Sequence, residues 1–138
     1  ELVDTLSKPV SLYKIKGKYT VLVFWDPSCG HCKEEIPRLD SAYNASWKNK
    51  GVMMLGIKTE GTQEEWLRFI REHKITGWVH ASDPESRSNY RRLYDVYSTP
   101  VVYLLDEQKK IVAKRLGVVQ LQEFLDRMTT TGNTAHNK

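Results

Sequence analysis

Cysteine is scarce in this sequence. Its 138 residues include two cysteines, Cys29 and Cys32, which stand in one Cys-Gly-His-Cys segment. A zinc site of the usual kind is disfavoured, because it needs four ligands and the chain has neither a second cysteine pair nor closely spaced histidines. The c-type haem motif is absent, since Lys33 stands where that motif has histidine. We therefore expect no metal and no cofactor, and a bridge that closes so short a loop would be a weak structural staple.

Long apolar runs and charge of one sign are also lacking. No segment is apolar for long enough to cross a bilayer. The net charge is +4, but acidic and basic residues alternate along most of the chain, so we expect no nucleic-acid partner. The chain opens at Glu1 without a charged-then-apolar leader, as it would if a leader had been removed. We expect one globular domain at residues 1–128 and a disordered tail at residues 129–138.

Hydrophobic periodicity predicts strands that alternate with helices. We expect strands at Tyr19–Trp25, Gly51–Ile57, Trp78–Ala81, Val101–Leu105 and Ile111–Leu116. We expect helices after the cysteine segment, after the capping box Thr62–Glu65, after Asp83 and over Leu121–Met128. The last two strands flank a polar turn and should form an antiparallel hairpin. This order predicts an α/β fold with a mixed central sheet and helices on both faces.

The placement of the cysteine pair predicts redox chemistry. Two cysteines separated by two residues at the first turn of a helix can close a disulfide without moving the rest of the fold. Unpaired backbone N–H groups and the positive end of the helix dipole favour a thiolate at Cys29, which makes Cys29 the expected nucleophile and Cys32 the resolving cysteine. A protonated His31 would lower the pKa of the Cys29 thiol further. The alternative is that His31 is a spacer without an electrostatic role.

Two segments resemble a known family. Residues 21–32 are similar to the active-site strand and loop of the thioredoxin superfamily, and Ser98–Pro100 is similar to its cis-proline loop. Residues 29–37 follow the pattern C-x-x-C-x-x-E-x-P, which resembles the TlpA-like branch of extracytoplasmic thiol–disulfide oxidoreductases. The resemblance implies a thioredoxin fold with an extra strand–helix insertion before the cis-proline. It also implies an extracytoplasmic location, the bacterial periplasm.

The resemblance also implies roles for single residues outside the cysteine pair. Substrate is expected at Trp25, Thr99 and Pro100, with an extended peptide chain pairing beside a cis Pro100. In the TlpA-like branch a glutamate at the position of Glu35 influences proton transfer. Glu35 lies three residues after Cys32 on the same helical face, so it can accept the proton that Cys32 loses. The alternative is an acid that the helix dipole favours without a further role.

Three departures from the family pattern leave the direction of electron flow open. Val23 stands where cytoplasmic thioredoxins have a buried aspartate, and Ser28 replaces the tryptophan that commonly precedes the first cysteine. His31 replaces the proline of reducing thioredoxins and matches the CGHC loop of protein disulfide isomerases.

These observations predict a thiol–disulfide oxidoreductase that reduces or exchanges disulfides of protein or peptide partners and is served by a redox partner. We expect a monomer. The sequence is also compatible with a membrane tether or a larger parent chain outside these residues. One alternative is a redox-inert, thioredoxin-like module that binds peptides. The other is a peroxiredoxin-like peroxidase, which is less well supported because Asp26 stands where that chemistry typically has Thr or Ser.

Overall fold

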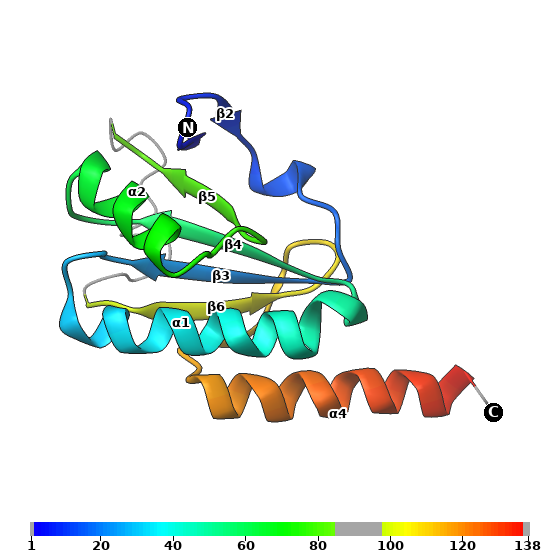
Figure 1. The fold of residues 1–138 in the computed structure, drawn as a ribbon. Helices are drawn as coiled ribbons and strands as arrows, with labels where there is room; N and C mark the ends of the chain where they lie inside the picture. The colour runs from blue at the N-terminus through cyan, green and yellow to red at the C-terminus, as the bar shows by residue number, and fades with distance from the viewer. Residues whose placement is uncertain (1, 85–97, 137–138) are drawn as a thin grey trace.

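A mixed β-sheet forms the centre of the protein (Figure 1). The computed structural model describes residues 2–84 and 98–136. In this part of the chain the sheet has seven strands, in the order β2-β1-β5-β4-β3-β6-β7. The strands are β1 (Leu2–Asp4), β2 (Pro9–Val10), β3 (Tyr19–Trp25), β4 (Val52–Lys58), β5 (Val79–Ser82), β6 (Val101–Leu105) and β7 (Ile111–Lys114). Strands β3, β4 and β5 run parallel, and the other pairs are antiparallel.

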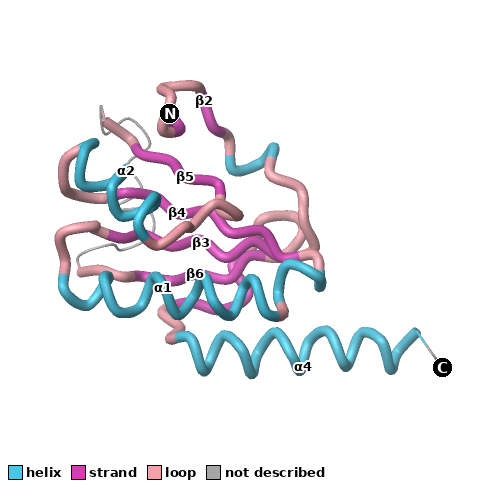
Figure 2. The backbone as a smooth tube through the Cα atoms, in the orientation of Figure 1, coloured by secondary structure: helices cyan, strands magenta, loops and turns pink. Residues whose placement is uncertain are grey.

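Helices connect the central strands and close the chain (Figure 2). The described helices are η1 (Leu12–Lys14), α1 (Gly30–Ala45), η2 (Trp47–Lys50), α2 (Gln63–Glu72) and α4 (Val118–His136), with η1 and η2 of the 3-10 type. Helix α2 starts at the expected capping box, in which Thr62 and Glu65 satisfy each other's backbone N–H groups. Every helix in the described ranges is too short or too polar to span a bilayer.

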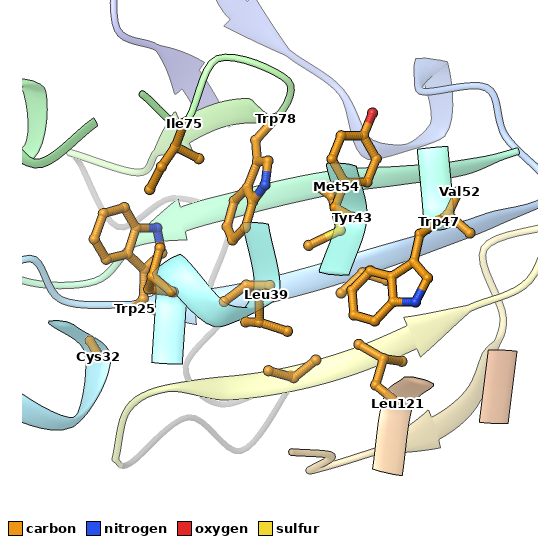
Figure 3. Close-up of a cluster of buried hydrophobic side chains, with 14 of the residues drawn as sticks. Trp25, Cys32, Leu39, Tyr43, Trp47, Val52, Met54, Ile75, Trp78 and Leu121 are labelled. Atoms are coloured by element: carbon orange, nitrogen blue, oxygen red, sulfur yellow. The ribbon is translucent and has the colours of Figure 1, made fainter. Parts of the chain in front are cut away.

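Strand β3 is buried on both faces, and its side chains alternate between two apolar clusters. Val21, Val23 and Trp25 belong to the first cluster, part of which Figure 3 shows. Leu22 and Phe24 belong to the second cluster, on the opposite face of the sheet. Because core side chains hold β3 from both sides, the loop that follows it starts from a rigid position.

The two faces of the sheet are covered by different parts of the chain. Helices α1, α2 and α4 all contribute to the first cluster, through side chains such as Ile36, Trp66 and Leu121. On the second face the described cover is the N-terminal segment, including Leu12 of η1. The helix that the sequence predicts after Asp83 lies outside the described residues.

The predicted mixed sheet is confirmed, and the ends of the predicted strands move by at most two residues. The β6–β7 hairpin is confirmed as well. Helix α2 and strand β5 lie between β4 and Pro100, where the resemblance places an insertion. The sequence analysis does not anticipate β1 and β2, because strands of three and two residues are too short for periodicity to reveal. Helix α4 continues past residue 128, where we expect the tail to begin, and the domain boundary stays a prediction.

The packing around β3 can be tested at a glycine of the neighbouring strand, β4. Gly56 of β4 pairs with Val23, and a Cβ at Gly56 would lie 3.0 Å from Cε3 of Trp78 and 3.1 Å from Nε1 of Trp25. Both rings are buried, so neither can move aside without disturbing the core. We expect Gly56→Ala to lower the free energy of unfolding in urea by about 1–3 kcal/mol. The matched control is Gly30→Ala, whose Cβ would have no neighbour within 4 Å, and equal effects would contradict the packing argument.

Candidate active site

The end of β3 lies beside the start of β6 because the two strands pair antiparallel. Phe24 pairs with Val101, so the residues that follow β3 adjoin those that precede β6. The peptide bond between Thr99 and Pro100 is cis, the form that the resemblance implies. The thiol of Cys29 donates a hydrogen bond to the carbonyl oxygen of Thr99, with 3.8 Å between Sγ and O. Strand pairing thus brings together two segments that are 70 residues apart in the sequence.

Cys29 is the N-cap residue of α1, and its side chain is half-buried. The pKa of the Cys29 thiol is lowered from its ordinary value, chiefly because the backbone N–H of Cys32 donates a hydrogen bond to its sulfur. The Cys32 thiol, the Thr99 side chain and the backbone N–H of His31 lower this pKa further, while partial burial opposes them. The two backbone donors among them, the N–H groups of His31 and Cys32, are unpaired groups at a helix start, which were expected to favour a thiolate.

Cys32 lies in the first turn of α1 and is completely buried (Figure 3). Burial raises the pKa of the Cys32 thiol to about 11, because an apolar environment disfavours the charged thiolate. A hydrogen bond from the backbone N–H of Asp26, 3.4 Å from Sγ, partly offsets this effect. Of the two sulfurs, Cys29 therefore ionises first as the pH rises. This order fits the predicted roles of attacking and resolving cysteine.

The loop between β3 and α1 is organised by Asp26. Its Oδ1 atom accepts hydrogen bonds from the backbone N–H of Ser28 at 2.8 Å and from the Ser28 hydroxyl at 2.6 Å. Its carbonyl oxygen accepts a hydrogen bond from the backbone N–H of Cys29 at 3.1 Å. This organising role of Asp26 is not among the predictions made from the sequence. The signal was the Asp-x-Ser spacing, which is typical of a turn closed by an aspartate side chain.

A groove runs from Pro100 along the space between α1 and the start of α4. Its first part has a volume of about 220 Å³ and is lined by His31, Glu35 and Leu116 among others. Its second part has a volume of about 580 Å³ and continues to Val119, whose side chain is 70% exposed. Glu35, Gly117 and Val118 line both parts, so the two hollows adjoin, and we treat them together as one groove. An extended chain that reaches the cysteines past Pro100 would have this groove beside it.

Two predicted site residues, His31 and Glu35, border the groove. The carboxylate of Glu35 forms an ion pair with the guanidinium of Arg38 at 3.4 Å. Among the hydrogen bonds of the described residues, none joins Glu35 to Cys32, so its part in proton transfer stays a prediction. The imidazole of His31 is exposed, and what this residue contributes at the Cys29 sulfur is its backbone N–H.

Trp25 lies in the core, whereas the resemblance places it in contact with substrate. Its side chain is completely buried, and its ring packs on that of Phe69 with 5.1 Å between the centroids. A buried indole cannot touch a docked substrate directly. The position of Trp25 therefore does not support the expected contact, and we assign the residue to the packing beneath the active-site loop.

Comparisons with known proteins agree on one family. The model of the AhpC/TSA family matches residues 1–114. The thiol–disulfide oxidoreductase ResA of Bacillus cereus is 26% identical over 129 residues, which cover 91% of this chain and 72% of that protein. A domain of a possible thiol–disulfide isomerase from Cytophaga hutchinsonii has 39% identity and a TM-score of 0.86, covering 96% of this chain and 90% of that domain. The thioredoxin domain of a thiol–disulfide oxidoreductase from Bacteroides vulgatus has 31% identity and a TM-score of 0.81, covering 92% and 90%. The predicted thioredoxin-like fold is confirmed.

The opposite pKa shifts of the two cysteines predict unequal alkylation. We expect iodoacetamide to label Cys29 with a pH midpoint below 9.0, because the thiolate is the reactive form. In the Cys29→Ser variant the thiol of Cys32 should resist labelling until the pH approaches about 11. Mass spectrometry after labelling over a pH series measures both midpoints. The denatured chain is the control, in which the midpoints should coincide, and coinciding midpoints in the folded protein would contradict the assignment.

Proposed function

The chain belongs to the AhpC/TSA family, and we propose that it acts in that family as a thiol–disulfide oxidoreductase on protein or peptide partners. The observation that carries the proposal is the contrast between half-buried Cys29, whose pKa is lowered, and buried Cys32, whose pKa is raised to about 11. The names of the relatives support the same activity. Peroxide reduction is less well supported. Asp26 stands where that chemistry typically has the hydroxyl of Thr or Ser, and its carboxylate accepts two hydrogen bonds from Ser28.

The two cysteines divide the reaction between them. The Cys29 thiolate attacks one sulfur of a substrate disulfide, so that a Cys29–substrate disulfide forms and the other substrate sulfur leaves as a thiolate. Cys32 then loses its proton and attacks the Sγ atom of Cys29, which forms the Cys29–Cys32 disulfide and releases the second substrate thiolate. Two electrons pass from the protein to the substrate. A partner that carries a dithiol must return them, and the reverse sequence oxidises a dithiol substrate.

In this proposal, partner chains dock in extended form beside Thr99 and Pro100, the two residues that precede β6. The Thr99 carbonyl lies 3.8 Å from the Cys29 sulfur, so a partner backbone paired with Thr99 holds its own cysteine within reach. The groove beyond Pro100 then receives the neighbouring residues of the partner in extended form. Its far end offers the exposed Val119 side chain to an apolar residue of that segment.

Glu35 and His31 act at the rim of the same groove in this proposal. Glu35 is available to a basic side chain of the partner when its ion pair with Arg38, which is on the surface, exchanges. It also stays our candidate for accepting the proton of Cys32 when a bound partner excludes water. His31 is exposed beside Glu35 on the groove wall, where a charged imidazole acts on the partner and on the Cys29 thiolate together.

We further propose an extracytoplasmic location, which for a bacterial protein with two membranes is the periplasm. The resemblance of residues 29–37 to the TlpA-like branch supports it, as does the similarity to ResA. The partners that fit this location are secreted proteins with cysteine pairs and a redox partner that exchanges electrons through a dithiol. A monomeric state is part of the same proposal.

Substitution of either cysteine separates the two steps. We expect Cys29→Ser to reduce the rate of insulin disulfide reduction to the uncatalysed background. The thiol that remains in this variant, that of Cys32, is buried and cannot attack insulin. Cys32→Ser should instead trap insulin as a mixed disulfide on Cys29, visible as a dithiothreitol-sensitive band on a non-reducing gel. Insulin reduction that persists in Cys29→Ser would contradict the catalytic role of Cys29 and would favour the alternative of a redox-inert module that binds peptides.

Substitution in the groove tests where the partner docks. Burial of an apolar side chain contributes on the order of 1.5 kcal/mol, so Val119→Glu should raise KM for a protein disulfide about tenfold. The rate with a small aromatic disulfide, which does not reach Val119, should be unchanged. Leu6→Glu is the matched control. Leu6 is 73% exposed and follows β1, near the β2 edge of the sheet, and the substitution adds the same charge as Val119→Glu. Equal KM values for the two variants would remove the groove from the docking surface.

A further inference from the structure

We propose that Asp26 is a positioning residue, which holds both cysteines at once and thereby sets the rate at which Cys32 resolves the mixed disulfide. This inference rests on the proposed thiol–disulfide exchange and extends it to a residue that takes no part in the electron transfer. It starts from the number of hydrogen bonds that converge on Asp26. They connect a single residue to the turn, to Cys29 and to Cys32.

The side chain of Asp26 closes the turn, and its backbone reaches the cysteines. Oδ1 binds the backbone N–H of Ser28 at 2.8 Å and the hydroxyl of Ser28 at 2.6 Å. The carbonyl oxygen binds the N–H of Cys29 at 3.1 Å, and the N–H of Asp26 points at the sulfur of Cys32 at 3.4 Å. The carboxylate thus fixes the turn that follows Asp26, while on the other side the Trp25 carbonyl accepts hydrogen bonds from the backbone N–H and the hydroxyl of Thr59 at 2.8 and 3.2 Å.

The loop after β4 supports the turn from outside. Gly61 has a φ of +90°, and a Cβ there would lie 3.1 Å from Cγ of Pro27 and 3.4 Å from Oδ1 of Asp26. The carbonyl oxygen of Gly61 accepts a hydrogen bond from Nζ of Lys58 at 2.9 Å. Pro27 itself is buried, so the turn is confined between this loop and the core. A confined turn holds the N–H of Asp26 in one direction.

The Asp26 carboxylate also interacts with a charged group of a neighbouring helix. Glu65 of α2 feels repulsion from the Asp26 carboxylate and attraction from Lys33 of α1. Lys33 and Glu65 line a hollow with Phe69 that shares no lining residue with the Pro100 groove. A variant that alters the charge of Asp26 must therefore be distinguished from one that alters the turn.

The backbone N–H of Asp26 matters at the second chemical step. Cys32 must become a thiolate before it forms a bond to the Sγ atom of Cys29 and displaces the substrate thiolate. Burial opposes that ionisation, and the Asp26 N–H favours it by donating to the developing negative charge. If the side chain no longer closes the turn, Asp26 is held from its N-terminal side alone, through the Trp25 carbonyl, and its N–H moves away from the Cys32 sulfur part of the time. The first step, attack by Cys29, depends less on this donor.

Two substitutions at Asp26 separate the turn from the charge. Asp26→Ala removes the acceptor for Ser28, and Asp26→Asn keeps an oxygen acceptor while removing the charge. In single-turnover reactions with a peptide disulfide, we expect Asp26→Ala to slow release of the second thiol about three- to tenfold at neutral pH, the effect of losing part of one hydrogen bond to a charged group. Formation of the mixed disulfide should change less than about twofold, and Asp26→Asn should behave as wild type in both steps.

The matched control is Asp106→Ala, which opens a similar turn at the far end of the sheet. Oδ1 of Asp106 accepts from the backbone N–H groups of Gln108 and Lys110, both at 2.9 Å. This variant should leave both steps unchanged. A resolving step in Asp26→Ala as fast as in wild type overturns the inference, and so does an Asp26→Asn variant as slow as Asp26→Ala, which would assign the effect to charge.

A second readout does not need catalysis. In a Cys29→Ser background, the pH dependence of iodoacetamide labelling, read by mass spectrometry, follows the ionisation of Cys32 without interference from the seven tyrosines. Asp26→Ala should move this titration to higher pH, whereas Asp26→Asn and Asp106→Ala should not. If the wild-type protein reduced no disulfide, the proposed function would fail while this titration still tested the position of the Asp26 N–H. An unmoved titration in Asp26→Ala would overturn the positioning role even in an active enzyme.

Discussion

Antiparallel pairing of β3 with β6 is the constraint on which the site depends. The cysteines follow the carboxyl end of β3, and Thr99 and Pro100 precede β6, so the register that pairs Phe24 with Val101 decides whether they meet. A shift of that register by one residue would turn the side chains of β6 to the opposite faces of the sheet. The two apolar clusters oppose such a shift, because it would move Tyr103 out of the second cluster and into the space that smaller side chains fill in the first. The core therefore fixes the distance between the Cys29 sulfur and the Thr99 carbonyl.

The difference between the two cysteines follows from the same geometry. Helix α1 begins directly after the active-site loop, so Cys29 lies at its open end and Cys32 one turn further, against the core. Backbone N–H groups at a helix start stabilise the thiolate of Cys29. The apolar core excludes water from Cys32 and so disfavours its thiolate. Two identical side chains, three residues apart, thereby acquire opposite pKa shifts. Apart from the two cysteines themselves, none of the groups in the described part of the chain that shift either pKa is a titratable side chain.

Sequence reasoning reached the elements whose signal is local and missed those that depend on tertiary packing. The continuous apolar run predicts β3, and the capping box predicts α2, because each pattern reports the environment of its own residues. Trp25 illustrates the limit: the sequence cannot tell whether an indole at the end of a strand faces a substrate or Phe69. The groove was equally hidden, since Leu116 and Val119 meet α1 through the fold alone. Asp26 had a local signal, but its link to Cys32 required coordinates.

The CGHC sequence by itself does not fix the direction of electron flow in this protein. A lowered pKa at Cys29 stabilises the dithiol form and makes the disulfide a stronger oxidant, whereas a raised pKa at Cys32 does not add to that stabilisation. The groups that lower the pKa of Cys29 include the backbone N–H of His31, a donor that every residue except proline would supply. Histidine at this position therefore differs from the proline of reducing thioredoxins first by having an N–H, and only then by its imidazole. The redox poise of the pair is a property of the helix start, and the choice of substrate is a property of the groove beside it.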